Sequence, residues 1–177
     1  MNDFVSILAG GDRRSIGQSK AVIAAVKLEP ARFEELWDCL SNDDPLVRMR
    51  VADALEKISR QDFRVLKPYK KALLTHALDD DTPEVRWHLI AMTSRLPLQD
   101  GEASKVMRYL KRAQRDDASR IVKVMALQAG FDLTSQHPSL AISLRAMLDQ
   151  ALNSRWPSVR ARARKLSRSV CSRAETG

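Results

Sequence analysis

The sequence predicts an all-α fold built from repeated pairs of helices. Three observations support this prediction: a segment that recurs four times, apolar residues at helical spacing, and a shortage of the residues that β folds need. The 177 residues include only 6 Gly, 7 Pro, 3 Trp, 2 Tyr and 4 Phe, whereas sandwiches and barrels use many turns and aromatic-rich strands. Apolar residues make up 44% of the chain and charged residues 29%, which is the balance of a folded globular protein.

The recurring segment contains an anchor valine that is followed directly by a basic residue. The four valines lie 38, 37 and 37 residues apart. The four valine–base pairs are Val47-Arg48, Val85-Arg86, Val122-Lys123 and Val159-Arg160. Acidic pairs precede the first three, at 43–44, 80–81 and 116–117. Self-similarity at a period of this length predicts an array in which each repeat packs on its neighbours.

Each repeat is predicted to contain two helices. The second helix begins in the recurring segment, because apolar residues such as Val47, Val51 and Ile58 fall on one helical face. The acidic pairs are expected to cap these helices, and a proline suits the first turn at positions 45, 83 and 157. The first helices are predicted at 31–40, 67–78, 102–113 and 139–152.

Two further helices, at 3–8 and 15–27, fit the period poorly and are predicted to form an N-terminal cap. The predicted organisation is one solenoid domain over 1–177, with about ten helices, short loops and no strand. Its parts are the cap at 1–29, repeats at 30–60, 61–98, 99–134 and 135–172, and a tail at 173–177.

Two arginines of the last repeat, Arg164 and Arg168, stand at positions where earlier repeats would pack against a neighbour. The earlier residues are Ala52, Ile90 and Leu127 at the first position, and Glu56, Ser94 and Phe131 at the second. Because a terminal repeat has no following neighbour, its outer face is expected to be polar.

This pattern resembles the HEAT-repeat family over roughly residues 31–172. The motif is clearest at 44–55, where Asp44, Val47-Arg48 and Ala54-Leu55 stand in order, and it blurs in the third repeat, where Gly130 replaces Leu55. The resemblance implies a right-handed α-solenoid of stacked helical hairpins whose second helices line a concave face. It says little about function, because the same scaffold serves adaptors, transport factors and DNA-repair proteins.

The net charge of +8 is concentrated near the C-terminus. Residues 150–174 contain seven bases and no acid, whereas the other residues carry 23 bases and 22 acids. The seven are Arg155, Arg160, Arg162, Arg164, Lys165, Arg168 and Arg173. The end of the repeat array explains why the surface of the last helix is polar. It does not explain why all of its charges are positive, since like charges four residues apart on a helix reduce its stability. A binding patch and a solvated cap both remain open.

The second helices offer another candidate surface, which is mildly basic. Its residues facing away from the core are expected to include Arg50, His88, Met125 and Arg162. The bases that follow the anchor valines are instead expected to pair with acids between the helices, here Asp44, Asp81 and Asp117.

Sequence motifs of catalytic and metal sites are absent. The three histidines lie far apart, there is no Cys-x-x-Cys or G-x-S-x-G, and the glycines form no phosphate loop. HEAT-like DNA glycosylases place Trp and Asp in a basic groove, but no Trp/Asp pair reaches the groove at helical spacing here. We therefore expect no enzyme activity, no cofactor, no metal and no small-molecule substrate. With no apolar run long enough to span a membrane and an acid at Asp3, where a signal peptide has bases, the prediction is a cytoplasmic protein.

The sequence thus favours a non-enzymatic adaptor that engages an acidic protein or peptide. The alternative is a sequence-nonspecific nucleic-acid-binding protein that uses the same bases on phosphates. The predicted partner-binding residues are Arg50, His88, Met125, Arg155, Arg160, Arg162, Arg164, Lys165 and Arg168.

Overall fold

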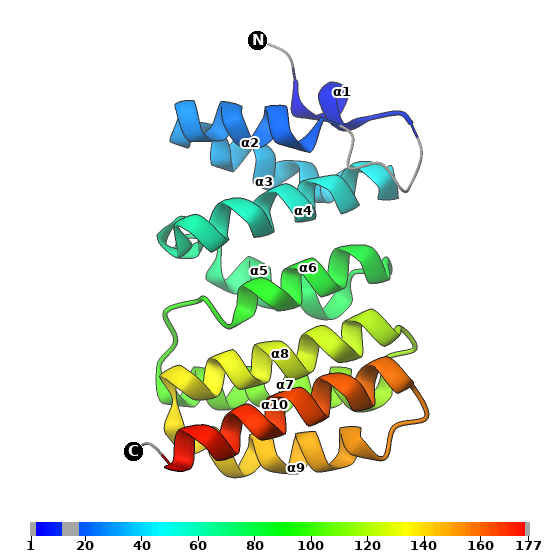
Figure 1. Cartoon of the computed structure of the whole chain (residues 1–177). Coiled ribbons are helices and arrows are strands. Elements are labelled where there is room, and N and C mark those ends of the chain that lie inside the picture. Colours follow the sequence, from blue (N-terminus) through cyan, green and yellow to red (C-terminus); the bar gives the residue numbers. More distant parts are fainter. Residues whose placement is uncertain (1–2, 12–17, 176–177) are drawn as a thin grey trace. The chain divides into compact units, whose positions relative to one another are not determined.

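The computed structural model describes residues 3–11 and 18–175, and every regular element within these residues is a helix (Figure 1). The described residues form ten α-helices, joined in places by short 3₁₀ turns, and contain no strand. The helices are α1 Phe4–Leu8, α2 Ser19–Leu28, α3 Phe33–Asp38, α4 Pro45–Gln61, α5 Lys70–Asp79, α6 Pro83–Thr93, α7 Asp100–Asp116, α8 Arg120–Gln136, α9 Ala141–Leu152 and α10 Pro157–Glu175. The predicted all-α class is confirmed, and the handedness of the solenoid stays a prediction.

The helix bounds differ from the prediction where 3₁₀ turns intervene. Helix α3 is shorter than 31–40 because 3₁₀ turns, Pro30–Arg32 and Cys39–Ser41, precede and follow it. Helix α5 begins at Lys70 rather than at 67, because a 3₁₀ turn, Phe63–Leu66, extends to this point and is closed by the backbone N–H of Lys67 on the carbonyl oxygen of Arg64. The predicted tail is helical up to Glu175. Residues 15–17 of the second predicted helix, and residues 176–177, lie outside the described part of the chain.

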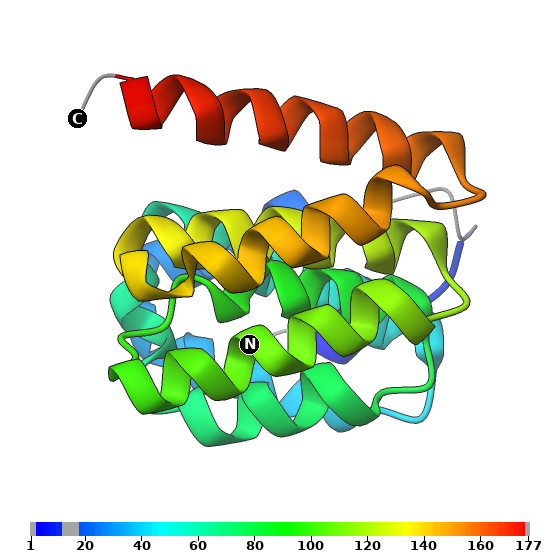
Figure 2. The ribbon, with the colours of Figure 1, turned by 90° about the horizontal axis from the view of Figure 1, so that it is seen from below.

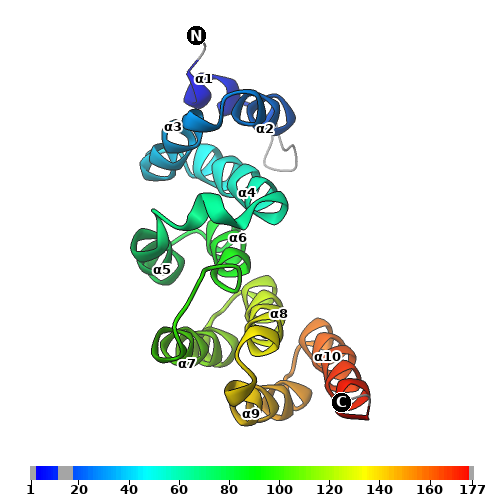
Figure 3. The ribbon, with the colours of Figure 1, turned by 90° about the vertical axis from the view of Figure 1, so that its left-hand side faces the viewer.

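The chain divides into two compact units, Met1–Met92 and Thr93–Gly177. In the first unit α4 packs against α1, α2 and α3. In the second, α7 with α8 and α9 with α10 form two helical hairpins, and α8 also contacts α9 and α10. Figure 3 shows α7 and α9 on one side of this unit and α8 and α10 on the other. Figure 2 shows α9 and α10 running alongside one another from the turn that joins them.

All four anchor valines are buried, as the repeat pattern predicts. In the earlier repeats, the residues at the positions equivalent to Arg164 and Arg168 are also buried. Both arginines, in contrast, are exposed. The expected polar outer face of the last repeat is therefore confirmed.

The third repeat departs from the motif at Gly130 because three side chains crowd this position. A Cβ atom added there would lie 3.4 Å from the Sδ atom of Met147 and 3.7 Å from the Sδ atom of Met107 and a methyl group of Leu144. These side chains fill the space that a leucine occupies at the equivalent position of the first repeat. Glycine at this position thus permits close packing of α8 with α7 and α9.

Replacing Leu89 with alanine should destabilise the fold, because Leu89 is fully buried in α6. The lost transfer free energy and the remaining cavity together should lower the free energy of unfolding by about 2–5 kcal/mol. Urea denaturation followed by far-UV circular dichroism measures the loss. The matched control is Leu28→Ala, since Leu28 is 90% exposed and should change the free energy of unfolding by no more than about 0.5 kcal/mol. Equal effects of the two substitutions would contradict a core role for Leu89.

Candidate binding surface

The base after each anchor valine holds the turn that precedes its helix. Arg48, Arg86 and Arg160 each donate from Nη1 to the carbonyl oxygen six residues earlier, at 3.0, 2.8 and 2.7 Å. Lys123 donates from Nζ to the carbonyl oxygens of Gln114 and Arg115, at 2.9 and 2.6 Å. These contacts give the bases a structural role, because a cation stabilises carbonyl groups that a helix end leaves without partners.

The acids at these turns accept hydrogen bonds from the backbone at the start of the next helix. Asp80 and Asp117 each accept a hydrogen bond from the backbone N–H two residues later, at 2.7 Å, and Asp44 does so from Leu46 at 2.8 Å. Asp44 is the N-cap of α4, but the N-cap of α8 is Ser119. The expectation that the acidic pairs supply the caps therefore holds for the first repeat and is wrong for the third.

The expected pairing of Arg48 with Asp44 is also wrong. The Arg48 guanidinium instead lies 3.0 Å from a carboxylate oxygen of Asp81 and 3.5 Å from one of Asp80, both in the next repeat. This contact occupies the open recess between the starts of α4 and α6, whose lining includes Asp43 and Glu84. Because Arg48, the cation among its lining residues, already pairs with Asp80 and Asp81, the recess offers no free cation to a ligand.

Arg50 does not belong to the predicted binding surface. Only 2% of this residue is exposed, and its Nη1 atom donates to the carbonyl oxygens of Leu8 and Gly10. The N-terminal segment covers the start of α4, and it turns there through two residues of positive φ, Gly10 at 72° and Gly11 at 78°. The arginine thus fastens this segment to the first repeat.

His88 is likewise buried rather than available to a partner. It is 5% exposed, its ring stacks on that of Trp87, and its Nδ1 atom makes no hydrogen bond within the described residues. Burial lowers the pKa of His88 to about 4, although the nearby carboxylates of Asp53 and Glu56 act in the opposite direction. This histidine is therefore a neutral core residue at physiological pH.

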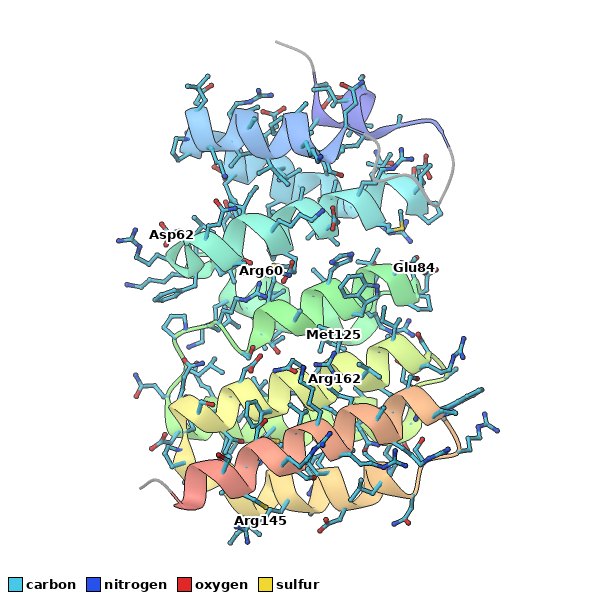
Figure 4. All side chains as sticks on the ribbon, in the orientation of Figure 1. Arg60, Asp62, Glu84, Met125, Arg145 and Arg162 are labelled. Carbon is cyan, nitrogen blue, oxygen red and sulfur yellow. The ribbon has the colours of Figure 1, made fainter. Side chains whose placement is uncertain are left out.

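The other predicted residues lie on α8 and α10 in the second unit, where Figure 4 shows Met125 and Arg162. Met125 is partly exposed on α8. Arg162 donates from Nη1 to the Oε1 atom of Gln128 at 2.8 Å, and Gln128 donates from Nε2 to a carboxylate oxygen of Asp132 at 2.8 Å. Because Gln128 follows Met125 by three residues, this network holds the Arg162 guanidinium beside the face of α8 that carries Met125.

Four of the predicted bases are exposed and make no ion pair with a carboxylate in the described part of the chain. They are Arg155, Arg164, Lys165 and Arg168. The guanidinium of Arg155 lies 4.6 Å from the ring centre of Trp156, and that of Arg120 lies 5.3 Å from the same ring, both within the range of cation–π attraction. Arg160 is only partly exposed, and its guanidinium donates to the carbonyl oxygen of Ser154 in the turn. It is therefore less available to a partner than the sequence predicts.

Ile121 is a surface residue that the sequence prediction missed. It is 45% exposed and lies one helical turn before Met125 on α8, so the two share a face. The spacing of four residues from Met125 is the signal for a shared face, but Ile121 also lies inside the recurring segment next to the buried Val122, and the repeat pattern does not distinguish the two. We define the α8/α10 face by the two apolar residues of α8 and by the predicted bases of α10 and of the turn before it: Ile121, Met125, Arg155, Arg162, Arg164, Lys165 and Arg168.

The outer side of α7 was also missed. The unit from Thr93 onward contains 16 of the 30 basic residues and 7 of the 22 acidic ones, so it holds the whole net positive charge of the chain. Helix α10 accounts for part of this excess, and the stretch 103–115 on α7 adds five bases without an acid. The balanced total outside residues 150–174 hid this second concentration.

The cysteines show no reactive arrangement. Burial raises the pKa of the Cys39 thiol to about 11, and its Sγ atom donates to the carbonyl oxygen of Glu35 at 3.2 Å. Cys171 is exposed on α10, and neither cysteine forms a disulfide. Within residues 3–11 and 18–175, no three His, Cys, Asp or Glu side chains are placed to hold a metal ion. None of the helices there is both long and apolar enough to cross a membrane.

A family model described as a HEAT repeat domain matches residues 11–170. No curated protein and no solved structure matches the chain.

Arg50→Met should release the N-terminal segment, because it keeps a long apolar side chain but removes the donors to Leu8 and Gly10. Leaving buried carbonyl groups without partners should lower the free energy of unfolding by about 1–3 kcal/mol. Hydrogen exchange should accelerate in residues 4–8 and remain unchanged in α10. Unchanged protection of α1 would contradict the fastening role of Arg50.

The buried neutral state of His88 should make the fold less stable in acid. As the pH falls from the ordinary pKa of 6.5 to about 4, the unfolded chain binds a proton at His88 that the folded chain does not. The free energy of unfolding should therefore decrease over this interval, by roughly 2–3 kcal/mol from this residue. Urea midpoints at about pH 7 and about pH 4.5 measure the decrease. His88→Gln should lose clearly less stability over the same interval, and an identical loss in both proteins would show that other groups cause it.

Proposed function

The chain belongs to the HEAT-repeat family, and we propose that it is a non-enzymatic interaction module whose α8/α10 face binds an acidic segment of a protein partner. Members of this family are helical-repeat modules that typically act as scaffolds in protein interactions. The partner class and the surface are the parts that we propose.

One observation supports this proposal most directly. Helices α8 and α10 pack against each other, α8 exposes Ile121 and part of Met125, and Arg162 of α10 bonds to Gln128 of α8. The other bases of the α8/α10 face have no carboxylate partner within the described residues. Ile121 and Met125 can bury an apolar side chain of the partner, and the flexible thioether of Met125 adapts to different shapes. Arg155, Lys165 and Arg168 can then pair with carboxylates around that contact, which would match the apolar centre and charged rim of protein interfaces.

The single sign of charge on α10 favours binding over simple solvation. Arg160, Arg164 and Arg168 follow one another at intervals of four residues, and repulsion between them opposes helix formation. An acidic partner would relieve this repulsion and would accelerate association through electrostatic attraction.

The apolar residues favour a protein over a nucleic acid on this face. Ile121 and Met125 are aliphatic, whereas proteins that bind single-stranded nucleic acid stack bases on exposed aromatic rings. The aromatic ring nearest to the face, that of Trp156, already contacts the guanidinium groups of Arg120 and Arg155. The polar pair on this face, Arg162 and Gln128, is engaged in its own hydrogen bond, so phosphate contacts from the remaining bases would supply most of the binding to a nucleic acid.

Selection from a random peptide library displayed on phage, with the whole chain as bait, tests the proposal. The selected peptides should be rich in Asp and Glu and should share at least one large apolar residue. Met125→Ala should weaken binding of a selected peptide at least tenfold, as expected for an apolar anchor. Ile142→Ala is the matched control, because Ile142 is 83% exposed on α9 and should leave the affinity unchanged.

The charge contribution is measured with the same peptide. The double change Arg164→Glu and Arg168→Glu should slow association and remove most of its salt dependence, because it reverses four units of charge. Peptides without acidic enrichment, or affinities that respond to neither the Met125 nor the arginine changes, would contradict the proposal. Stronger binding of duplex DNA than of peptide, lost in the double variant and indifferent to Met125→Ala, would favour the nucleic-acid alternative.

A further inference from the structure

The outer side of α7 is basic along two-thirds of the helix. Between positions 105 and 115 every fully exposed side chain is a lysine or an arginine: Lys105, Arg108, Arg112 and Arg115. Lys111, on the same stretch, is partly exposed. Figure 3 shows α7 at the edge of the second unit, with α8 and α9 between it and α10. This face is therefore separate from the α8/α10 face.

The four exposed bases form a straight row. Their intervals of three, four and three residues place them on one side of the helix, and a rise of 1.5 Å per residue gives the row a length of about 15 Å. The opposite side of the helix is buried, through Ala103, Val106, Met107, Leu110 and Ala113. The partly exposed Tyr109 and Lys111 flank the row.

Most of this charge has no internal partner. Arg115 forms an ion pair with Asp116 at 2.7 Å, but Lys105, Arg108 and Arg112 lie within 4 Å of no carboxylate in the described part of the chain. The acids at the start of α7 are engaged elsewhere, since Asp100 contacts the Nδ1 atom of His137 and Glu102 accepts from the backbone of Gln99, both at 2.8 Å. Asp116, four residues after Arg112, is exposed and attracts both Arg115 and Arg112, so Arg108 is the base of the row without an acid one turn away.

The chemistry of the row matches a chain of phosphates better than it matches a protein or a membrane. A protein partner needs an apolar anchor at the centre of the contact, and no exposed side chain of the row is apolar. A helix that lies in a membrane surface inserts its apolar side, but the apolar side of α7 is packed in the core of the unit. Arginine, by contrast, forms paired hydrogen bonds to phosphate oxygens, and phosphate contacts require no apolar surface.

We infer that the α7 row binds the phosphate backbone of a nucleic acid, without sequence preference, independently of the partner bound at the α8/α10 face. We expect no sequence preference, because the row consists of lysine and arginine side chains that contact phosphates, and it contains no other side chain to contact the edges of the nucleobases. A protein with both faces occupied would join a nucleic acid to an acidic protein partner.

Fluorescence anisotropy with a labelled 20-base-pair duplex of arbitrary sequence, at about 50 and 200 mM salt, tests the inference on the full chain. Each phosphate contact contributes about −0.9 to the slope of log affinity against log salt. The triple variant Lys105→Gln, Arg108→Gln, Arg112→Gln should therefore flatten the slope by about 2.7. Over this range of salt, the wild type should lose roughly 40-fold more affinity than the variant.

The matched control removes the same charge from the other helix, through Arg164→Gln, Lys165→Gln and Arg168→Gln. Its slope should stay close to that of the wild type, and circular dichroism should show that both variants are folded. Equal flattening by both variants would show a response to net charge alone and would overturn the inference. An unchanged slope in the α7 variant would also overturn it, as would wild-type binding to vesicles with one-third phosphatidylserine but not to the duplex.

Discussion

The turn inside each repeat depends on a cation placed against backbone carbonyl groups. The end of a helix leaves carbonyl oxygens without partners and carries a partial negative charge. In all four repeats the residue after the anchor valine supplies donors to these oxygens, and three times the acceptor lies six residues earlier. The third repeat uses Lys123, whose pKa is lowered by burial as its single ammonium group reaches two carbonyl oxygens. With this contact in place, the second helix of each repeat can pack its valine into the core.

The same contact explains why the fold could be predicted from the sequence. Valine is needed for packing and the adjacent base for the turn, so both recur at one period and reveal the array. The helices could be predicted from this period, and errors in their bounds arose where 3₁₀ turns intervened, as before α5. The partners of the bases could not be predicted, because an acid near a base in the sequence can equally well bond to its own backbone. Asp80 and Asp117 do so.

The candidate surface was less predictable, since exposure depends on parts of the chain that the period does not describe. Arg50 is buried because a segment some forty residues earlier covers it, and His88 is buried although its register predicted a surface position. The bases of α10 could be predicted from charge counting and lie mostly at the surface. The bases of α7 could not be recognised in the same way. Outside residues 150–174 the chain has 23 bases and 22 acids, and the acids of the first unit balance the bases of α7 in this total.

Gly130 limits how freely these repeats can be exchanged. A repeat protein is often regarded as a row of interchangeable modules, and a recombination event that moved the first repeat into the third position would carry Leu55 to the place of Gly130. That side chain would meet the sulfur atoms of Met107 and Met147, one of which lies in the same repeat and the other in the next. Exchange at this point therefore requires Met107 and Met147 to move or to be replaced together with the transferred segment, so this position couples the sequences of two neighbouring repeats.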